Sequence, residues 1–371
     1  MGSTSTGNGA SGKVLLTGAT GHLGANLLRR LLDDGHEVRV LLRRASDNGS
    51  VEGLGAERAY GDLRDRAAVD AAVKGCRRVY HVAAKVSTLD GDGAHKREVY
   101  ECNVVGTRHV MESCLRHGVE KAVVTSSFSA VGYDPGAPSR PSDEEMRYYP
   151  FDRALPYECS KAFAEMEVLR AVSRGLDACI ATSCAVVGPH DYKPSRMGRA
   201  LCDFANGKLR AYIDGGFEFV SAHDIVEGHL LAMARGRRGD KYIIATEFMT
   251  LPEIMSIWAE ITGRPKPRVK LPASLMLAVA EVASPLLTRL APDFPQRFTP
   301  GAVRILRLRR HADTSKARRE LGFRPTSLRD AWQQAYDFFV RRGAIRGSGP
   351  RRAGQAGGAP ITAEGPRAAA S

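Results

Sequence analysis

Short apolar runs alternate with amphipathic segments along the first half of the chain. The runs are mostly apolar on both faces, which is typical of strands inside a parallel sheet; they are KVLLTG (13–18), HEVRVLL (36–42), RRVYHVA (77–83), KAVVTSS (121–127) and DACIATS (177–183). The segment after the first run has leucines at helical spacing and ends at Gly35, where a left-handed helix terminus is expected. Strands that alternate with helices predict an α/β fold built on a doubly wound parallel sheet.

The glycine-rich segment TGATGHLG directly follows the first predicted strand and opens the first predicted helix. Gly18, Gly21 and Gly24 at these positions would let backbone approach a pyrophosphate, while the helix N-terminus supplies partial positive charge. If these were three ordinary turn glycines, neither their regular spacing nor their position between a strand and a helix would be explained. The sequence therefore predicts a dinucleotide site at the end of the first strand.

The second predicted strand runs into Arg43 and Arg44. An acidic residue at this place would bind the 2′-hydroxyl of NAD, whereas a guanidinium can pair with the 2′-phosphate of NADP. We therefore expect NADP(H), with NAD less favoured; two solvated loop arginines are the alternative. Asp62, after the third strand, would accept a hydrogen bond from the adenine amino group or act as a loop or helix-capping residue.

Tyr157 and Lys161 lie four residues apart, so on a helix they share one face. A nearby ammonium and a nicotinamide's positive charge would lower the tyrosine pKa by the roughly 3 units that a base near neutral pH requires. Ser127 stands at the end of the strand KAVVTSS, where ligands of open α/β folds bind. These three residues predict acid–base chemistry at a carbonyl or alcohol.

The chain resembles the extended short-chain dehydrogenase/reductases over about residues 13–342. Seven motifs in order carry this resemblance: TGATGHLG, GDLRD (61–65), HVAA (81–84), NVVGT (103–107), TSS (125–127), YECSK (157–161) and VGP (187–189). Within this superfamily it is most similar to the dihydroflavonol-4-reductase-like branch, in particular to bacterial proteins labelled hopanoid-associated sugar epimerases. The resemblance implies a Rossmann-type sheet with a smaller C-terminal substrate domain.

The same resemblance implies roles for individual residues. Tyr157 would be the acid/base, Lys161 would bind the nicotinamide ribose and lower the tyrosine pKa, and Ser127 would position the reacting oxygen. Asn103 matches a family position beside the site, but it is equally explained as a buried polar residue that satisfies backbone. Together with Arg43, Arg44 and Asp62, the residues expected to contact the cofactor are Gly18, Thr20, Gly21, His22, Leu23, Gly24, Leu63, Ala83, Ala84, Asn103, Tyr157, Lys161, Cys184 and Val187.

The alternation of strands and helices weakens after about residue 185, which indicates a second domain. We expect an NAD(P)-binding domain over 13–185, rejoined by strands within about 219–246, and a substrate-binding domain over 186–218 and 247–342. In the latter, Thr250 and Glu253 form a capping box and Gly263 ends the helix. Residues 1–12 and 343–371 are expected to be disordered tails, because they contain too few large apolar residues to fold.

Composition excludes several other functions. The net charge is +13, but the arginines are spread along the chain without a nucleic-acid-binding module, so no nucleic-acid partner is expected. The seven cysteines form no C-x-x-C pair and predict neither disulfides nor a zinc site. Since His223 and His229 would face opposite sides of a helix, with Asp224 as its N-cap, we expect no metal.

The chain shows neither a secretion signal nor an apolar stretch long enough to span a membrane, so a cytoplasmic protein without an integral membrane segment is expected. Segment 271–287 is predicted to be a half-buried helix pair, with peripheral lipid contact as the alternative. The basic run 304–320 is interpreted as solvated surface, with a carrier-protein dock as the alternative. Tyr133, Tyr148 and Tyr149 would line the substrate cleft or pack the loop.

Three functions are compatible with these features. The favoured one is an NADP-dependent oxidoreductase that reduces a small-molecule ketone or aldehyde to an alcohol. The alternative is a nucleotide-sugar epimerase or dehydratase with bound NAD, a cofactor that Arg43 and Arg44 disfavour. A non-catalytic NADP sensor would typically lack Tyr157 and Lys161. Where members of the group have Thr-Pro-Thr-Gly-Arg, this chain has Pro194, Ser195, Arg196, Met197, Gly198 and Arg199. We expect Arg196 or Met197 to alter which substrate fits. Homodimers are common in families of this kind, so a homodimer remains open.

Overall fold

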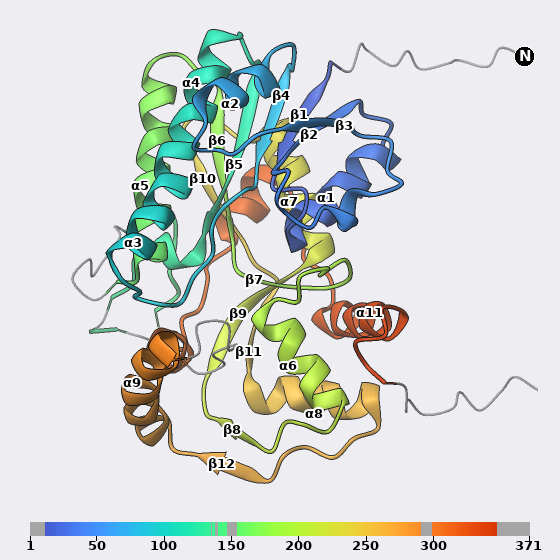
Figure 1. Cartoon of the computed structure of the whole chain (residues 1–371), viewed down its shortest axis with the longest axis vertical. Coiled ribbons are helices and arrows are strands. Elements are labelled where there is room, and N and C mark those ends of the chain that lie inside the picture. Colours follow the sequence, from blue (N-terminus) through green and yellow to red (C-terminus); the bar gives the residue numbers. More distant parts are fainter. Residues whose placement is uncertain (1–11, 135, 138–139, 147–153, 291–298, 347–371) are drawn as a thin grey trace, which may run out of the picture.

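The computed structural model describes residues 12–134, 136–137, 140–146, 154–290 and 299–346. Its main element is a fully parallel sheet in which the strands lie in the order β10-β6-β5-β4-β1-β2-β3 (Figure 1). These strands are β1 (Val14–Thr17), β2 (Val38–Leu42), β3 (Glu57–Tyr60), β4 (Arg78–His81), β5 (Lys121–Ser127), β6 (Ala178–Ser183) and β10 (Lys241–Ile244). The predicted doubly wound sheet is confirmed.

Helices cover both faces of this sheet. One face packs against α2 (Arg66–Val73), α4 (Gly106–Arg116) and α5 (Pro156–Ser173), and the other against α1 (His22–Asp33) and α7 (Ala222–Arg235). The leucines of α1 form the expected buried stripe, and Gly35 follows the helix with a φ of 80°. A π-helical turn, Glu101–Val105, joins α3 (Gly93–Tyr100) to α4.

The order of strands fixes where a ligand can bind. The chain moves outward from β1 to β2 and β3, and then returns to place β4 on the other side of β1. Loops after β1 and β4 therefore leave the sheet in opposite directions, which opens a crevice at the carboxyl ends of these two strands. The glycine-rich segment follows β1 at this point.

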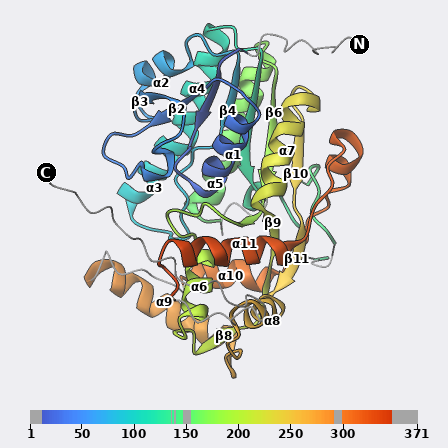
Figure 2. The same ribbon diagram turned by 90° about the vertical axis from the view of Figure 1, so that its right-hand side faces the viewer.

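A smaller second lobe lies beyond the carboxyl edge of the main sheet, and α11 (Leu328–Arg341) runs across it (Figure 2). It contains the sheet β11-β9-β7, formed by β7 (Ala185–Val187), β9 (Gly216–Ser221) and β11 (Glu247–Thr250), and the pair β8 (Ala211–Ile213) and β12 (Val269–Leu271). Its other helices are α6 (Arg196–Ala205), α8 (Leu251–Thr262), α9 (Ala273–Leu290) and α10 (Pro300–Leu308). Trp258 and Trp332 meet edge to face in its core, with ring centroids 5.1 Å apart.

Two boundaries differ from the sequence-based expectation. The strand within FEFVSAHD does not rejoin the main sheet; β10 occupies the place beside β6, and β9 pairs with β7 and β11 instead. The predicted start of the C-terminal tail at residue 343 is too early, since Ile345 is buried in the core of the second lobe. The capping box of Thr250 and Glu253 and the end of α8 at Gly263 are as predicted.

Within the described residues, none of the helices combines the length and the apolar character that crossing a bilayer requires.

Candidate active site

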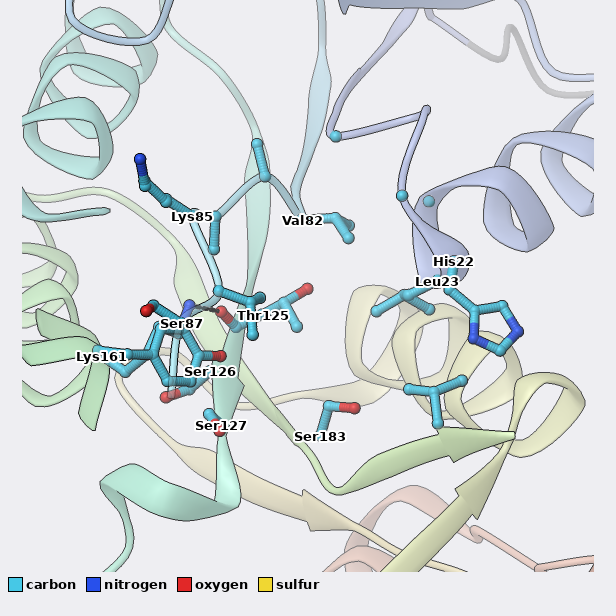
Figure 3. A pocket seen from close by; sticks show the side chains of 18 of the residues that line it. His22, Leu23, Val82, Lys85, Ser87, Thr125, Ser126, Ser127, Lys161 and Ser183 are labelled. Carbon is cyan, nitrogen blue, oxygen red and sulfur yellow. Dashed lines mark hydrogen bonds between the residues drawn. The ribbon is translucent and has the colours of Figure 1, made fainter. Parts of the chain in front are cut away.

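A cavity of about 820 Å³ lies between the two lobes, at the carboxyl edge of the main sheet. The loops after β1, β2, β4 and β5 and the first turns of α5 form one side of it, and residues of β9 and α10 form part of the other. Figure 3 shows His22 and Leu23 at one end of this cavity and Ser127 and Lys161 at the other, with Ser183 between them.

In the glycine-rich loop, two glycines are required by close packing, and a third is not. Gly18 has a φ of 80°, and a Cβ there would lie 2.6 Å from the backbone nitrogen of Ala83; a Cβ on Gly24 would clash with the Gly18 carbonyl oxygen. A Cβ on Gly21 would meet nothing closer than 3.4 Å, so packing does not account for this glycine. Helix α1 begins without a side-chain cap or an acidic residue in its first turn. This N-terminus therefore suits a diphosphate.

A buried hydrogen-bond chain holds the loop after β4 against the glycine-rich loop. The Thr17 hydroxyl lies 2.8 Å from Nδ1 of His81, whose Nε2 lies 3.0 Å from the Thr107 hydroxyl. The backbone N–H of Ala83 donates to the Thr17 hydroxyl. Burial lowers the pKa of His81 to about 3, so the imidazole is neutral. His81 thus fixes the backbone of the loop that reaches Ala83 and Ala84.

The two arginines after β2 have different surroundings. Arg43 lines the cavity, whereas the Arg44 guanidinium lies 4.5 Å from the ring centroid of Tyr60, outside the cavity lining. Asp62 lines the cavity, and its carboxylate accepts hydrogen bonds of 2.8 and 3.0 Å from the Arg64 side chain. The Arg64 guanidinium lowers the pKa of Asp62, with a smaller contribution from Arg43. Of these two arginines, Arg43 therefore lines the cavity and Arg44 does not.

Tyr157 and Lys161 share one face of α5, as predicted, and both line the cavity with Ser127. Burial raises the pKa of the Tyr157 phenol, and the nearby Ser127 hydroxyl partly opposes the increase. The Lys161 ammonium donates a hydrogen bond of 2.5 Å to the Thr125 carbonyl (Figure 3). Burial lowers the pKa of Lys161 to about 8, so the ammonium persists near neutral pH. A protonated phenol beside a hydroxyl suits proton donation to a carbonyl oxygen.

Asn103 lies in the π-helical turn and does not line the cavity. Its amide oxygen accepts the backbone N–H of Lys85 at 2.7 Å, and its amide nitrogen donates to the Lys85 carbonyl at 3.0 Å and to the Ser160 hydroxyl at 2.8 Å. Ser160 in turn donates to the carbonyl of Tyr157 at 2.7 Å. Asn103 therefore joins the loop after β4 to the first turn of α5.

The part of the cavity formed by the second lobe contains charged residues that the sequence did not indicate as site residues. Glu218 of β9 accepts the backbone N–H of Ala312 at 3.2 Å, and burial raises its pKa to about 7. Arg310 donates to the carbonyls of Val131 and Gly132. Apolar side chains of Phe217, Ile305 and Leu308 complete this wall. A bulky apolar ligand with a neutral polar group matches this composition.

The predicted cofactor contacts mostly lie on this cavity. Arg44, Asn103 and Val187 do not line it: Arg44 stacks on Tyr60, Asn103 binds backbone, and Val187 is buried in the core of the second lobe. The predicted residues that do line it are Gly18, Thr20, Gly21, His22, Leu23, Gly24, Arg43, Asp62, Leu63, Ala83, Ala84, Ser127, Tyr157, Lys161 and Cys184.

Sequence reasoning missed Lys85, Ser87 and Thr88, which follow β4 at the crevice and line the cavity. Their position after a central strand was an available signal. Glu218 was also detectable, because it is a charged residue inside the apolar strand run FEFV.

The histidines set aside as metal ligands have other contacts. His229 is buried, with one ring nitrogen 2.7 Å from the Thr125 hydroxyl and the other 2.7 Å from the Ile225 carbonyl, whereas His223 is largely exposed. Asp224 does not cap α7, because the Ser221 hydroxyl has that role; the Asp224 carboxylate instead accepts hydrogen bonds from Thr246 and Thr326.

Other candidate substrate contacts lie beside the cavity rather than on its lining. Arg196 donates to the hydroxyl of the lining residue Thr88, and Met197 packs against the second-lobe core. Tyr133 packs under the Arg310 guanidinium, whose central carbon lies 4.8 Å from the ring centroid. Tyr148 and Tyr149 lie outside the described residues.

Residues 14–245 match the NAD dependent epimerase/dehydratase family. The chain belongs to this family. Its relatives include sterol demethylase protein B of Methylococcus capsulatus (45% identical, 90% of this chain and 99% of that protein) and a putative dihydroflavonol 4-reductase of Synechocystis (33%, 89% and 95%). A third is 3beta-hydroxysteroid-dehydrogenase/decarboxylase isoform 1 of Arabidopsis thaliana (31%, 85% and 73%).

Solved structures are similar over nearly the whole chain. The crystal structure of gox2253 has a TM-score of 0.77 at 34% identity and covers 90% of this chain and 99% of its own. DesIV, a dTDP-glucose 4,6-dehydratase from Streptomyces venezuelae with NAD and TYD bound, has a TM-score of 0.70 at 25% identity, covering 89% and 98%. The predicted membership of the extended short-chain dehydrogenase/reductases is confirmed, and the family supports an enzyme that uses a nicotinamide cofactor.

Proposed function

We propose that this protein is an NADP(H)-dependent oxidoreductase that reduces a ketone or aldehyde to an alcohol. The observation that carries this proposal is the convergence of Ser127, Tyr157 and Lys161 on one cavity that also contains the glycine-rich loop. The reductase and dehydrogenase relatives support the same class of reaction. The main sheet would hold the cofactor and the second lobe would hold the substrate.

The residues of the chain would divide the reaction between them. When bound, the nicotinamide supplies the hydride that reaches the carbonyl carbon. Ser127 donates a hydrogen bond to the carbonyl oxygen, and the Tyr157 phenol delivers the proton that this oxygen takes up as the carbonyl π bond breaks. The Lys161 ammonium, held by the Thr125 carbonyl, orients the ribose hydroxyls and stabilises the phenolate that remains.

We propose Arg43 as the residue that selects NADP(H) over NAD(H). Arg43 lines the cavity after β2, and charge-assisted hydrogen bonds to a phosphate contribute about 1.5–3 kcal/mol. In a fluorescence titration of the cofactor-stripped protein, Arg43→Ala should therefore weaken NADPH binding by about 10- to 100-fold and leave NADH binding nearly unchanged. The matched control is Arg44→Ala, which should retain the preference. Tighter binding of NADH than NADPH by the native protein would overturn this assignment.

A steroid-like ketone is the substrate class that we propose. Phe217, Ile305 and Leu308 supply apolar surface next to the proposed catalytic residues. The sterol demethylase and hydroxysteroid dehydrogenase names of two relatives point to the same chemistry. The test measures NADPH consumption with a panel of steroidal ketones and of small aliphatic ketones, with Tyr157→Phe as the inactive control. Turnover confined to the small ketones would overturn the substrate class.

A nucleotide-sugar epimerase or dehydratase is the second candidate, supported by the family description and by the dehydratase neighbour with bound NAD. Such an enzyme returns the hydride to its substrate and shows no net consumption of cofactor. Retention of NAD through purification, together with conversion of a nucleotide sugar without added cofactor, would favour this candidate over the reductase.

A further inference from the structure

The second lobe exposes aliphatic side chains on β12 and α9. Val269 is 53% exposed, Leu275 53% and Val279 48%. Leu275 and Val279 lie four residues apart on α9 and form one outward stripe, whereas Met276 and Leu277 of the same helix pack against the core. Helix α9, which carries these residues, lies at the outer edge of the molecule, at the lower left of Figure 1.

Exposed cations lie on β12, which precedes α9 in the chain, and on α10, which packs against α9. Two acidic residues tie these elements into one face: Glu281 of α9 binds Arg304 of α10 at 3.0 Å, and Asp214 binds both Lys270 of β12 at 2.9 Å and Arg309 at 2.8 Å. With only these two carboxylates among the described residues of the face, positive charge prevails; its exposed cations are Arg268, Lys270, Arg304, Arg307 and Arg309.

The same face adjoins the proposed substrate cavity. α9 packs on α10, and α10 contributes Ile305 and Leu308 to the cavity lining. Leu308 is 38% exposed, so apolar surface extends from the cavity toward the outside of the molecule along α10. Ile305 and Leu308 therefore give the cavity an aliphatic edge on the side of α10.

We propose that this face, formed by β12, α9 and α10, docks on the surface of an anionic lipid bilayer. The stripe of Leu275 and Val279 would enter the boundary between headgroups and acyl chains, and the exposed cations of this face would pair with lipid phosphates. Docking of this kind needs both an apolar stripe and basic flanks, which this face combines. Delivery of a bilayer-dissolved ketone along α10 is a consequence that rests on the proposed function, whereas the docking itself does not.

The test is flotation of the full-length protein with vesicles of phosphatidylcholine alone or with added phosphatidylglycerol. We expect binding to the anionic vesicles that weakens as salt is raised, and little binding to the neutral ones. Arg307→Glu changes two units of charge and should lower partitioning about 30-fold, on the order of fivefold per unit. Leu275→Ser with Val279→Ser should lower it more than about tenfold through lost apolar burial.

Matched controls are Arg329→Glu on α11 and Tyr60→Ser on β3, two exposed positions outside this face. Thermal melts of all variants exclude unfolding as the cause of any loss. Equal binding to neutral and anionic vesicles, or unchanged binding by the face variants, would overturn the proposal. A change in oligomeric mass in the Leu275 and Val279 variant would overturn it as well, because the face would then contact a second copy. Vesicle binding without any NADPH-dependent turnover would contradict the proposed function alone.

Discussion

Tyr157 is the side chain on which the proposed chemistry depends. Its buried phenol keeps its proton near neutral pH, as an acid for carbonyl reduction must. Tyr157→Phe removes only the hydroxyl, so the rate of NADPH oxidation in a single turnover should fall by about 10²- to 10⁴-fold. The NADPH dissociation constant, measured by fluorescence, should change by less than about threefold. A variant that retained a large part of the native rate would remove Tyr157 from the mechanism.

Glu218 makes the stability of the protein depend on pH. Its pKa rises from 4.5 to about 7 through burial, so the folded chain binds more protons than the unfolded chain between these pH values. The contribution of this group to the free energy of unfolding is therefore largest below about pH 4.5 and is lost as the pH rises to about 7.

Glu218→Gln removes this dependence and keeps an acceptor for the Ala312 N–H. We compare the difference in melting temperature, variant minus native protein, at two pH values. This difference should be about 3 °C more positive at pH 8 than at pH 5. A difference of the same size at both pH values would show that the carboxyl is charged throughout. Glu247→Gln, at an exposed position of the neighbouring strand β11, is the control and should show a smaller change with pH.

Single residues show where sequence reasoning reaches its limit. The positions of Tyr157, Lys161 and Ser127 follow from helix and strand periodicity, and the structure brings them to one cavity. Periodicity does not decide between Arg43 and Arg44, because both follow β2 and only the packing of Arg44 on Tyr60 separates them. A contact between residues distant in the sequence, Arg44 with Tyr60, distinguishes the two arginines, and no local sequence pattern reveals it.

At the scale of elements, the π-helical turn before α4 joins two elements of the site. Asn103 uses its amide to hold both the backbone of Lys85 and the hydroxyl of Ser160. Asn103→Leu leaves these groups buried without partners and should cost about 2–3 kcal/mol of unfolding free energy, whereas Ser160→Ala should cost about 1 kcal/mol. Chemical denaturation measures both. Equal costs for the two variants would contradict the bridging role.

The elements themselves were predictable where local pattern determines them. Parallel strands such as β1 and β5, the capped helix α8 and the glycine-rich loop were all identified from sequence. The assignment of β9 to the main sheet was wrong, because an apolar run specifies a buried strand but not which sheet buries it. The loop after β4 carried no periodic signal, and its place depends on distant contacts through Asn103 and Thr17.

At the scale of the whole molecule, α5 exposes a second apolar surface, remote from the face proposed for lipid. Met166 is 62% exposed and Leu169 42%, while Ala164 and Val168 on the other side of the helix pack toward the sheet. Helix α5 is thus apolar on its outer side as well as on the side that packs toward the sheet. Such an exposed apolar surface favours a protein partner on the outer side of the helix. A second copy of this chain, related by a twofold axis, would bring two such helices together.

We therefore expect a homodimer in which α5 of one protomer packs on its partner. Light scattering after size exclusion should give twice the chain mass for the native protein and the single-chain mass for Met166→Glu with Leu169→Glu, because paired carboxylates would be buried at the contact. The variant with serine at Leu275 and Val279 is the matched control and should stay dimeric. A native protein that elutes as a monomer at concentrations above about 10 μM would refute the dimer. Since Tyr157 and Lys161 lie on the same helix, loss of the dimer should also lower activity by loosening the helix that positions them.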